Sequence, residues 1–156
     1  MILKFRAWDK KTETIQEVES ISFKEKKLVI DQKSVAWFNS DYIRNFDEVE
    51  LMQSTGLKDK SGVEIFEGDI VLITHKSTNY ADTYWHSYAE VFRAKNGAYR
   101  IRGEHIYETE LYSNRKQLTV AGNIYNSPEL LKRDRFMTTT ENPELLEDSN
   151  EHTRRD

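Results

Sequence analysis

Residues 51–74 read LMQSTGLKDKSGVEIFEGDIVLIT, and the rest of the chain is organised around this stretch. Turn-forming clusters at residues 59–62 and 67–69 frame the alternating segment VEIF at residues 63–66. The continuous apolar run IVLI at residues 70–73 follows the second turn. This pattern predicts a strand, a turn, a short strand, a second turn and a buried strand.

The composition favours a packed β protein. The chain has 156 residues, 12% of them aromatic, with only 6 Gly and 2 Pro. Because it has no Cys, it lacks disulfides, thiolate zinc sites and cysteine nucleophiles. No apolar run approaches the roughly 18 residues of a membrane span, and charged residues from Lys4 onward interrupt any signal peptide. We therefore expect a soluble, cytoplasmic protein with no membrane contact.

Charge divides the chain into a body at residues 1–132 and a tail at residues 133–156. The net charge is −4, and the tail holds four basic and seven acidic residues. The body is therefore nearly neutral and provides no long-range field for nucleic acid, so anion binding would need a local patch. Because apolar residues are scarce in the tail, we expect it to be disordered, with at most one helical turn near Leu145.

Two hairpins are expected before the organising stretch. Residues 3–8 alternate apolar and basic side chains, and a turn leads from them into residues 14–18. Residues 21–23 and 28–30 repeat this pattern around a lysine-rich turn, which we interpret as solvated. The aromatic segment at residues 35–45 fits either a helical face or an irregular packed loop, and the sequence does not decide between them.

A two-residue hairpin is predicted at Asn96-Gly97, because this dipeptide takes the positive φ angles of a type I′ turn. The predicted register pairs Arg93 with Arg100, Phe92 with Ile101, Ala94 with Tyr99, and Lys95 with Ala98. Alternation then directs four residues to the core: Phe92, Ala94, Tyr99 and Ile101. The same alternation places four basic residues on the other face: Arg93, Lys95, Arg100 and Arg102.

This basic face is the candidate surface for nucleic acid or another anion. Arg93 opposite Arg100 is an unfavourable like-charge pair, which a phosphate group would relieve. The alternative is that neighbouring carboxylates already neutralise these cations, and three are available: Glu90, Glu104 and Glu108.

An aromatic segment precedes the hairpin and contains Tyr80, Tyr84, Trp85 and Tyr88. These side chains would offer stacking surfaces for bases beside the basic face. Aromatic clusters next to strands are more often part of a core or a subunit interface. The second interpretation supports a self-associating protein whose strand edges and aromatic patch are covered by neighbouring subunits.

Residues 118–125 predict a last strand, in which Gly122 indicates a bulge or a close backbone approach. A short helix is expected to follow, with Ser127 as N-cap and Pro128 in its first turn. A similar Pro-Glu-Leu-Leu sequence recurs at residues 143–146 in the acidic tail. There it would either fold onto a partner or remain a solvated end.

No catalytic, cofactor or metal site is predicted. The glycines of residues 56–62 lack the Gly-Lys-Ser/Thr ending of a phosphate loop and suit turns better. We interpret Asp69 as a turn carboxylate that binds backbone amides, in preference to a catalytic group. His75, His86 and His105 would form a metal site only if the fold brought three separate segments together.

The sequence of residues 57–71, LKDKSGVEIFEGDIV, resembles the signature of the YopX-like family, whose members have a TGLKDKNG-x-x-I-x-EGDIV core. Residues 4–9 (KFRAWD) resemble the start of that family, and residues 122–125 (GNIY) with 128–131 (PELL) resemble its end. The resemblance implies small, mainly β, self-associating proteins of phages and bacterial prophages. It implies no established biochemical activity and no catalytic residues.

Together these observations predict β-hairpins that form an open barrel-like or twisted antiparallel sheet, a short C-terminal helix and a flexible tail. We expect a phage or prophage accessory protein in the cytoplasm of a bacterial host that is not an enzyme. It would act through self-assembly as a homo-oligomer and through binding of a phage or host protein. The alternative is a nucleic-acid-binding protein that uses the basic hairpin face.

Overall fold

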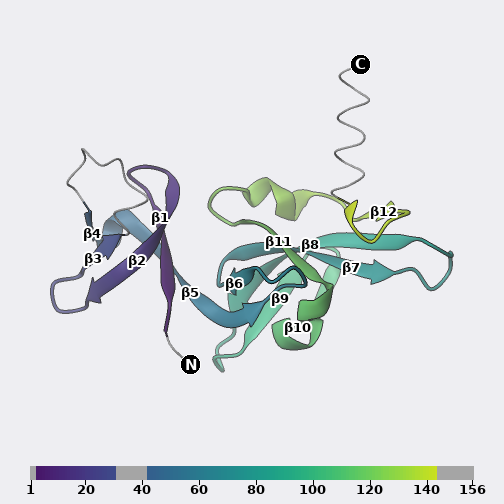
Figure 1. The fold of residues 1–156 in the computed structure, drawn as a ribbon, viewed down its shortest axis with the longest axis horizontal. Coiled ribbons are helices and arrows are strands. Elements are labelled where there is room, and N and C mark those ends of the chain that lie inside the picture. Colours follow the sequence, from purple (N-terminus) through teal and green to yellow (C-terminus); the bar gives the residue numbers. More distant parts are fainter. Residues whose placement is uncertain (1–2, 31–41, 144–156) are drawn as a thin grey trace, which may run out of the picture.

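The computed structural model describes residues 3–30 and 42–143, which form two antiparallel β-sheets (Figure 1). The first sheet has six strands in the order β4-β3-β2-β1-β5-β6. These strands are β1 (Phe5–Asp9), β2 (Thr14–Ser22), β3 (Lys27–Ile30), β4 (Ile43–Asn45), β5 (Val49–Lys58) and β6 (Glu64–Phe66). A short 3-10 helix, Phe46–Glu48, joins β4 to β5.

The second sheet has the order β10-β9-β8-β7-β11, and β12 pairs with the end of β8 that lies away from β9. Its strands are β7 (Asp69–Lys76), β8 (Tyr84–Arg93), β9 (Tyr99–Gly103), β10 (Ile106–Glu110), β11 (Leu118–Asn123) and β12 (Phe136–Thr138). The short helix α1 (Leu111–Asn114) follows β10, and 3-10 helices occupy Arg115–Gln117 and Pro128–Lys132. The predicted mainly β fold with a short C-terminal helix is therefore confirmed.

Strand β5 runs through both halves of the molecule (Figure 1). Its first residues pair with β1, and its last residues pair with β6. Gly56, with φ of 76°, lies where the β5–β6 register is irregular, and its positive φ suits a bulge. We call β1–β4 with residues 49–53 the N-terminal lobe, and residues 54–143 the C-terminal lobe.

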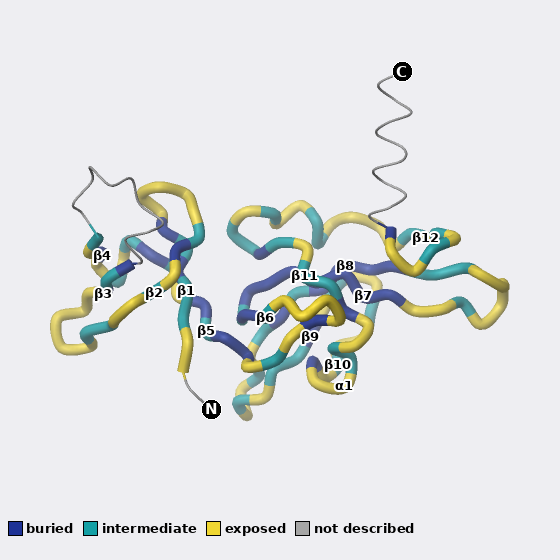
Figure 2. Tube along the Cα trace, in the orientation of Figure 1, coloured by how far each residue is buried: buried dark blue, intermediate teal, exposed yellow. Residues whose placement is uncertain are grey.

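The apolar run of β7 is buried on both faces of its sheet, as predicted from its unbroken sequence. Val71 and Ile73 enter one core, whereas Ile70 and Leu72 enter another. Figure 2 shows this burial along β7 and β8. The first core is completed by Ile65, Ala89, Val91, Ile101, Leu111 and Leu118. The second is covered by Ile124, Leu130, Leu131 and Phe136.

The N-terminal lobe has a smaller core of its own, formed by Ala7, Leu28, Ile30 and Val49. The two predicted opening hairpins build this lobe, as β1 with β2 and β2 with β3. Of residues 35–45, whose structure the sequence left open, residues 35–41 lie outside the described part. Ile43 begins β4.

The predicted register of the Asn96-Gly97 hairpin is wrong by one residue. Arg93 pairs with Tyr99, Phe92 with Arg100, Val91 with Ile101, and Glu90 with Arg102. Gly97 has φ of 88°, whereas Asn96 does not take a positive φ, so the turn is not type I′. The Gly97 N–H donates to the Ala94 carbonyl at 2.9 Å, and the Ala94 N–H donates to Ala98 at 2.8 Å, which gives a longer loop.

Burial explains this register. The observed pairing places Val91 opposite Ile101, and both side chains are fully buried. A slip of one residue exchanges the two faces of a strand. Phe92 therefore leaves the predicted core face, and Arg93 leaves the face of Arg100 and Arg102.

The bulge predicted at Gly122 is confirmed by a register shift between Val120 and Gly122. The predicted short helix is the 3-10 helix Pro128–Lys132, without a side-chain cap from Ser127. Part of the predicted tail, residues 133–143, is described and contains β12, in which Phe136 lies opposite His86. Residues 144–156 lie outside the described part. Among the described residues, no helix is both long and apolar enough to cross a membrane.

Candidate functional site

An ion pair between Arg6 of β1 and Asp69 of β7 connects the two lobes. Asp69 is fully buried, and it accepts a hydrogen bond from Arg6 Nη2 and another from the Phe66 N–H at 2.8 Å. The Arg6 guanidinium also lies 4.3 Å from the centre of the Phe66 ring. The interpretation of Asp69 as a turn carboxylate that binds a backbone amide is therefore confirmed.

Burial raises the pKa of Asp69 to about 6, although the Arg6 charge and the Phe66 amide both act to lower it. The negative charge of Asp59 adds to the increase. Asp69 is thus ionised at neutral pH and becomes protonated in mildly acidic solution.

Aromatic stacking forms a second connection between the lobes. The rings of Trp8 and Tyr125 are 6.1 Å apart and nearly parallel. The Ile124 N–H donates to the Gly68 carbonyl at 2.9 Å, and the Gly68 N–H donates to Val91 at 2.8 Å. Three of the four segments that resemble the YopX-like family (residues 4–9, 57–71 and 122–125) therefore meet at one junction.

Gly68 permits close packing at this junction. It has φ of 89°, and a Cβ atom there would lie 3.1 Å from Met52 Cε. A larger residue would be strained in this backbone conformation and would also crowd Met52. Glycine thus lets the turn between β6 and β7 lie against β5.

Two further aspartates fix the elements around the junction. Asp59 accepts hydrogen bonds from the N–H groups of Ser61, Val63 and Val120 at 2.8–2.9 Å, which ties the turn after β5 to β11. Asp9 forms a buried ion pair with Arg44 at 3.1 Å. Burial alone would raise the pKa of Asp9, but hydrogen bonds from Arg44 and its own turn hold that pKa below its usual value.

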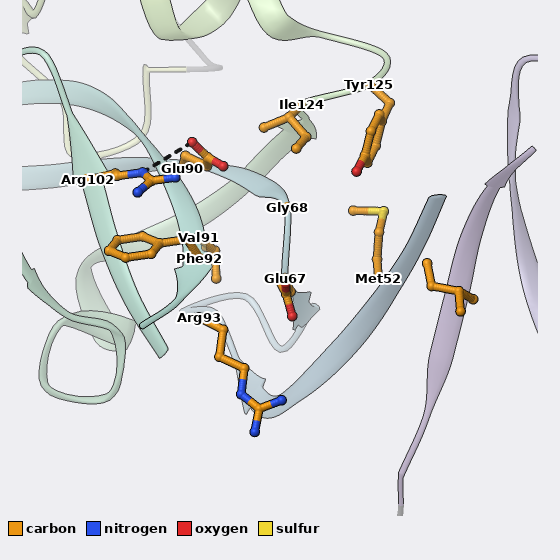
Figure 3. Close-up of a pocket in the computed structure, with 11 residues that line it drawn as sticks. Met52, Glu67, Gly68, Glu90, Val91, Phe92, Arg93, Arg102, Ile124 and Tyr125 are labelled. Atoms are coloured by element: carbon orange, nitrogen blue, oxygen red, sulfur yellow. Dashed lines mark ion pairs between the residues drawn. The ribbon is translucent and has the colours of Figure 1, made fainter. Parts of the chain in front are cut away.

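A cleft of about 280 Å³ opens beside this junction (Figure 3). We call it the interlobe cleft. β5, the β6–β7 turn, β8, β9 and the segment after β11 all contribute to it. Its lining residues are Leu51, Met52, Glu67, Gly68, Glu90, Val91, Phe92, Arg93, Arg102, Ile124 and Tyr125. The cleft therefore combines apolar side chains with two acidic and two basic residues.

Carboxylates and burial act together on the two tyrosines near this cleft. Burial raises the pKa of Tyr125, and the negative charges of Glu50, Glu67 and Glu90 raise it further. Burial also raises the pKa of Tyr99, where Glu67 adds to the effect and Arg93 opposes it. Both phenols therefore remain neutral hydrogen-bonding groups well above neutral pH.

The charged residues of the interlobe cleft differ in their pairing. Glu90 and Arg102 form an ion pair at 3.5 Å, drawn as a dashed line in Figure 3. Glu67 and Arg93 have no ion-pair partner among the described residues. Figure 3 shows both of these side chains directed away from the Glu90–Arg102 pair. One acidic and one basic group thus remain available at the rim.

The predicted basic face is divided by the observed register. Arg93 lies on the strand face opposite to Arg100 and Arg102, and Lys95 is exposed in the loop. Arg100 pairs with Glu108 at 2.9 Å. Arg102 pairs with Glu90 and lies 4.0 Å from the Phe92 ring. Two of the three carboxylates named as alternatives therefore neutralise these arginines.

The predicted aromatic cluster is also divided. Tyr84 and Tyr88 share one face of β8, Trp85 lies on the other, and Tyr80 is exposed in the β7–β8 loop. Arg133 lies 5.8 Å from the Tyr88 ring and 4.8 Å from the Phe136 ring, and Arg135 lies 4.4 Å from the Trp85 ring. Residues that follow the body thus cover part of the predicted patch.

The three histidines considered for a metal site do not converge. His86 is fully buried between Thr74 and Thr138, whereas His75 and His105 line a separate cleft. Within residues 3–30 and 42–143, no group of three potential metal ligands occurs.

The sequence did not indicate Arg6, Trp8, Glu67 or Tyr125 as site residues. A signal was present, because all four lie inside the family-like segments. Their convergence was not predictable, because the segments are separated by about 50 residues or more and no register between the lobes could be read from periodicity.

The model of the family described as "YopX protein" matches residues 4–132. The chain belongs to the YopX family. The crystal structure of protein EF1440 from Enterococcus faecalis resembles the chain at 30% sequence identity and a TM-score of 0.59, covering 84% of this chain and 99% of that one. No curated protein matches the chain. The family match covers β1 through the 3-10 helix Pro128–Lys132 and the whole interlobe cleft.

Proposed function

We propose that this YopX family member is a phage or prophage accessory protein that acts by binding and not by catalysis, in the cytoplasm of a bacterial host. It self-assembles, and the assembled form binds a phage or host protein. Membership of the YopX family and the similarity to EF1440 support an accessory role of this general kind.

The observation that carries self-assembly is the pair of unpaired charges, Glu67 and Arg93, at the rim of the interlobe cleft. They flank the partly exposed apolar side chains of Leu51, Phe92 and Ile124. An apolar centre with a charged rim is the usual composition of a protein interface. A surface with one free acid and one free base is also self-complementary under a two-fold rotation.

In the proposed dimer, Arg93 of one copy pairs with Glu67 of its partner, and the rotation repeats this contact. The lobes can present this surface because the Arg6–Asp69 and Trp8–Tyr125 contacts fix the position of the Glu67 turn. Both charges lie at an exposed or half-buried rim, so they set orientation and association rate more than the total affinity.

Charge exchange tests this proposal. Glu67→Arg and Arg93→Glu should each weaken association by roughly tenfold, because like charges then face each other. An equimolar mixture of the two variants should associate as well as the wild type, since every contact is again between opposite charges. Mass measured by light scattering over a range of concentrations provides the readout.

Two variants serve as controls. Arg100→Glu changes the same charge on the other face of the hairpin, where the partner is Glu108, and should leave the mass unchanged. Trp85→Ala tests the earlier interpretation that the aromatic segment is the subunit interface. Two outcomes would reject the Glu67–Arg93 contact. One is a decrease in mass for Trp85→Ala with no decrease for Glu67→Arg or Arg93→Glu. The other is a mixture of Glu67→Arg and Arg93→Glu whose mass stays below that of the wild type.

Nucleic-acid binding by the predicted basic face has no specific observation in its favour, because Arg100 and Arg102 are already paired. It stays a prediction. The Arg100→Glu variant tests it, since loss of nucleic-acid binding in that variant would restore the basic face as a site.

A further inference from the structure

A second cleft, of about 370 Å³, lies where β7 and β8 extend beyond the first core. We call it the distal cleft. β7, β8, the β9–β10 turn, β10, the end of α1 and the segment before β12 contribute to it. It is lined by Ile73, His75, Trp85, Ser87, His105, Ile106, Tyr107, Thr109, Asn114 and Arg135. None of these lining residues is acidic, which distinguishes it from the interlobe cleft.

Two aromatic side chains of the distal cleft have different surroundings. Tyr107, on β10, is 96% exposed and has no ring contact within the described part of the chain. Trp85 is half-buried, and the Arg135 guanidinium lies 4.4 Å from its ring. A freely exposed ring beside a tryptophan–arginine stack is an arrangement on which planar groups can stack.

The charged groups of this cleft favour an anion. Arg135 has a permanent positive charge, and His75 and His105 add two imidazole donors. The carboxylate of Asp134 lies 3.4 Å from His105 Nε2. Its side chain is 93% exposed, so solvent screens this contact and it neutralises little of the cleft.

Polar groups of the cleft also remain available for a ligand. The Ser87 hydroxyl has no hydrogen-bond partner in residues 3–30 and 42–143. The Asn114 side-chain amide donates to the Glu110 carbonyl at 2.7 Å, which leaves its oxygen as an acceptor. A ligand with both donors and acceptors on a planar ring would match these groups.

We propose that the distal cleft binds single-stranded nucleic acid. A base stacks on Tyr107, its edge meets Ser87 and Asn114, and an adjacent phosphate binds Arg135 and His105. Duplex DNA does not suit the site, because the faces of paired bases are already stacked on their neighbours and are not free to stack on Tyr107. This site lies on the C-terminal lobe and shares no residue with the predicted basic face, and it does not depend on self-assembly.

Fluorescence anisotropy with a labelled single-stranded DNA of about twelve nucleotides tests the proposal. The wild type should bind the single strand in preference to a duplex of the same sequence. Tyr107→Ala should weaken binding by roughly tenfold, and Tyr107→Phe should retain it, because stacking needs the ring and not the hydroxyl. Arg135→Gln should reduce the slope of log K against log salt by about one.

Tyr112→Ala is the matched control. Tyr112 is also an exposed tyrosine, 60% accessible, with Arg115 lying 3.9 Å from its ring, but it does not line the cleft. The Tyr112→Ala variant should bind the single-stranded DNA as tightly as the wild type does. No binding by the wild type, preference for the duplex, or equal losses in Tyr107→Ala and Tyr112→Ala would overturn the proposal. The light-scattering mass of each variant shows whether assembly is unchanged.

Discussion

The carboxylate of Asp69 lies in the interior of the C-terminal lobe, and the guanidinium of Arg6 reaches it from the N-terminal lobe. A buried pair of this kind loses much of its Coulombic gain to desolvation, so its contribution to stability is small. Its geometry nevertheless fixes one lobe against the other, because both groups can be satisfied in only one arrangement. This pair is the residue-scale basis of the interlobe cleft.

The pKa of Asp69 predicts how folding stability depends on pH. Its folded-state pKa of about 6 exceeds the ordinary value of 3.8, so the folded state binds the proton more tightly. The stability from this group is therefore present below about pH 4 and is lost as pH rises through about 6. Relative to Asp69→Asn, the wild type should lose about 2–3 kcal/mol of unfolding free energy between these pH values.

Urea denaturation of both proteins at several pH values measures this difference. Above pH 7 the difference in unfolding free energy between the wild type and Asp69→Asn should no longer change, because Asp69 is then ionised. A difference that is constant from pH 4 to 7, or that changes in the opposite direction, would contradict the assigned role of burial.

The role of Asp69 as a turn carboxylate was predictable, because Glu-Gly-Asp is a local signal. Its ion pair was not, since Arg6 lies 63 residues earlier. The sequence pattern placed Arg6 on the solvent-exposed face of a hairpin, as expected for a basic residue. Only the contact of Arg6 with Asp69 shows that this side chain of β1 reaches the other lobe.

At the scale of elements, the β8–β9 hairpin shows where local sequence rules stop. Asn-Gly correctly predicted the position of the turn, but one residue of loop length decided which side chains face the core. Val91 and Ala89 are buried in the observed register, and they outweigh the preference of Asn-Gly for a type I′ turn. The predicted placing of Arg93 on one face with Arg100 and Arg102 was incorrect for this reason.

Strand β12 is attached to β8 through the buried side chain of His86. Thr138 donates its hydroxyl proton to the Thr140 carbonyl, so its oxygen accepts from His86 Nε2 at 2.7 Å. His86 Nδ1 then accepts from the Thr74 hydroxyl at 2.9 Å. The ring also stacks on Phe136 at 5.0 Å. The neutral form of His86 therefore fits this chain of hydrogen bonds.

Attachment of β12 should weaken in acid. Burial lowers the pKa of His86, with a smaller contribution from the positive charge of Lys60. The stability from this group is therefore present above the ordinary pKa of about 6.5 and is lost as pH falls toward the lowered value. Hydrogen exchange of residues 136–138, corrected for intrinsic rates, should accelerate in acid before exchange in β7 does.

His86→Gln tests this assignment, because glutamine forms hydrogen bonds but does not titrate in this range. After correction for intrinsic rates, exchange at β12 in this variant should no longer accelerate in acid before exchange in β7 does. Acceleration identical to that of the wild type would assign the effect to another group.

At the scale of the whole molecule, the sequence predicted a mainly β body built from hairpins around residues 51–74, and this was confirmed. It did not predict two lobes, because β5 reads as one strand although its halves belong to different parts of the sheet (Figure 1). It also did not predict β12, which lies within the segment expected to be a tail. Three pairs with β8 and the packing of Phe136 order a segment that composition alone describes as a tail.

In the proposed assembly, copies of this chain associate through the interlobe cleft. Hydrogen–deuterium exchange of the wild type at increasing protein concentration tests it directly. We expect peptides covering Glu67 and residues 90–93 to become protected as the light-scattering mass increases, while those covering β12 do not change. Protection confined to other strand edges, or a mass that increases with no protection at the cleft, would contradict it.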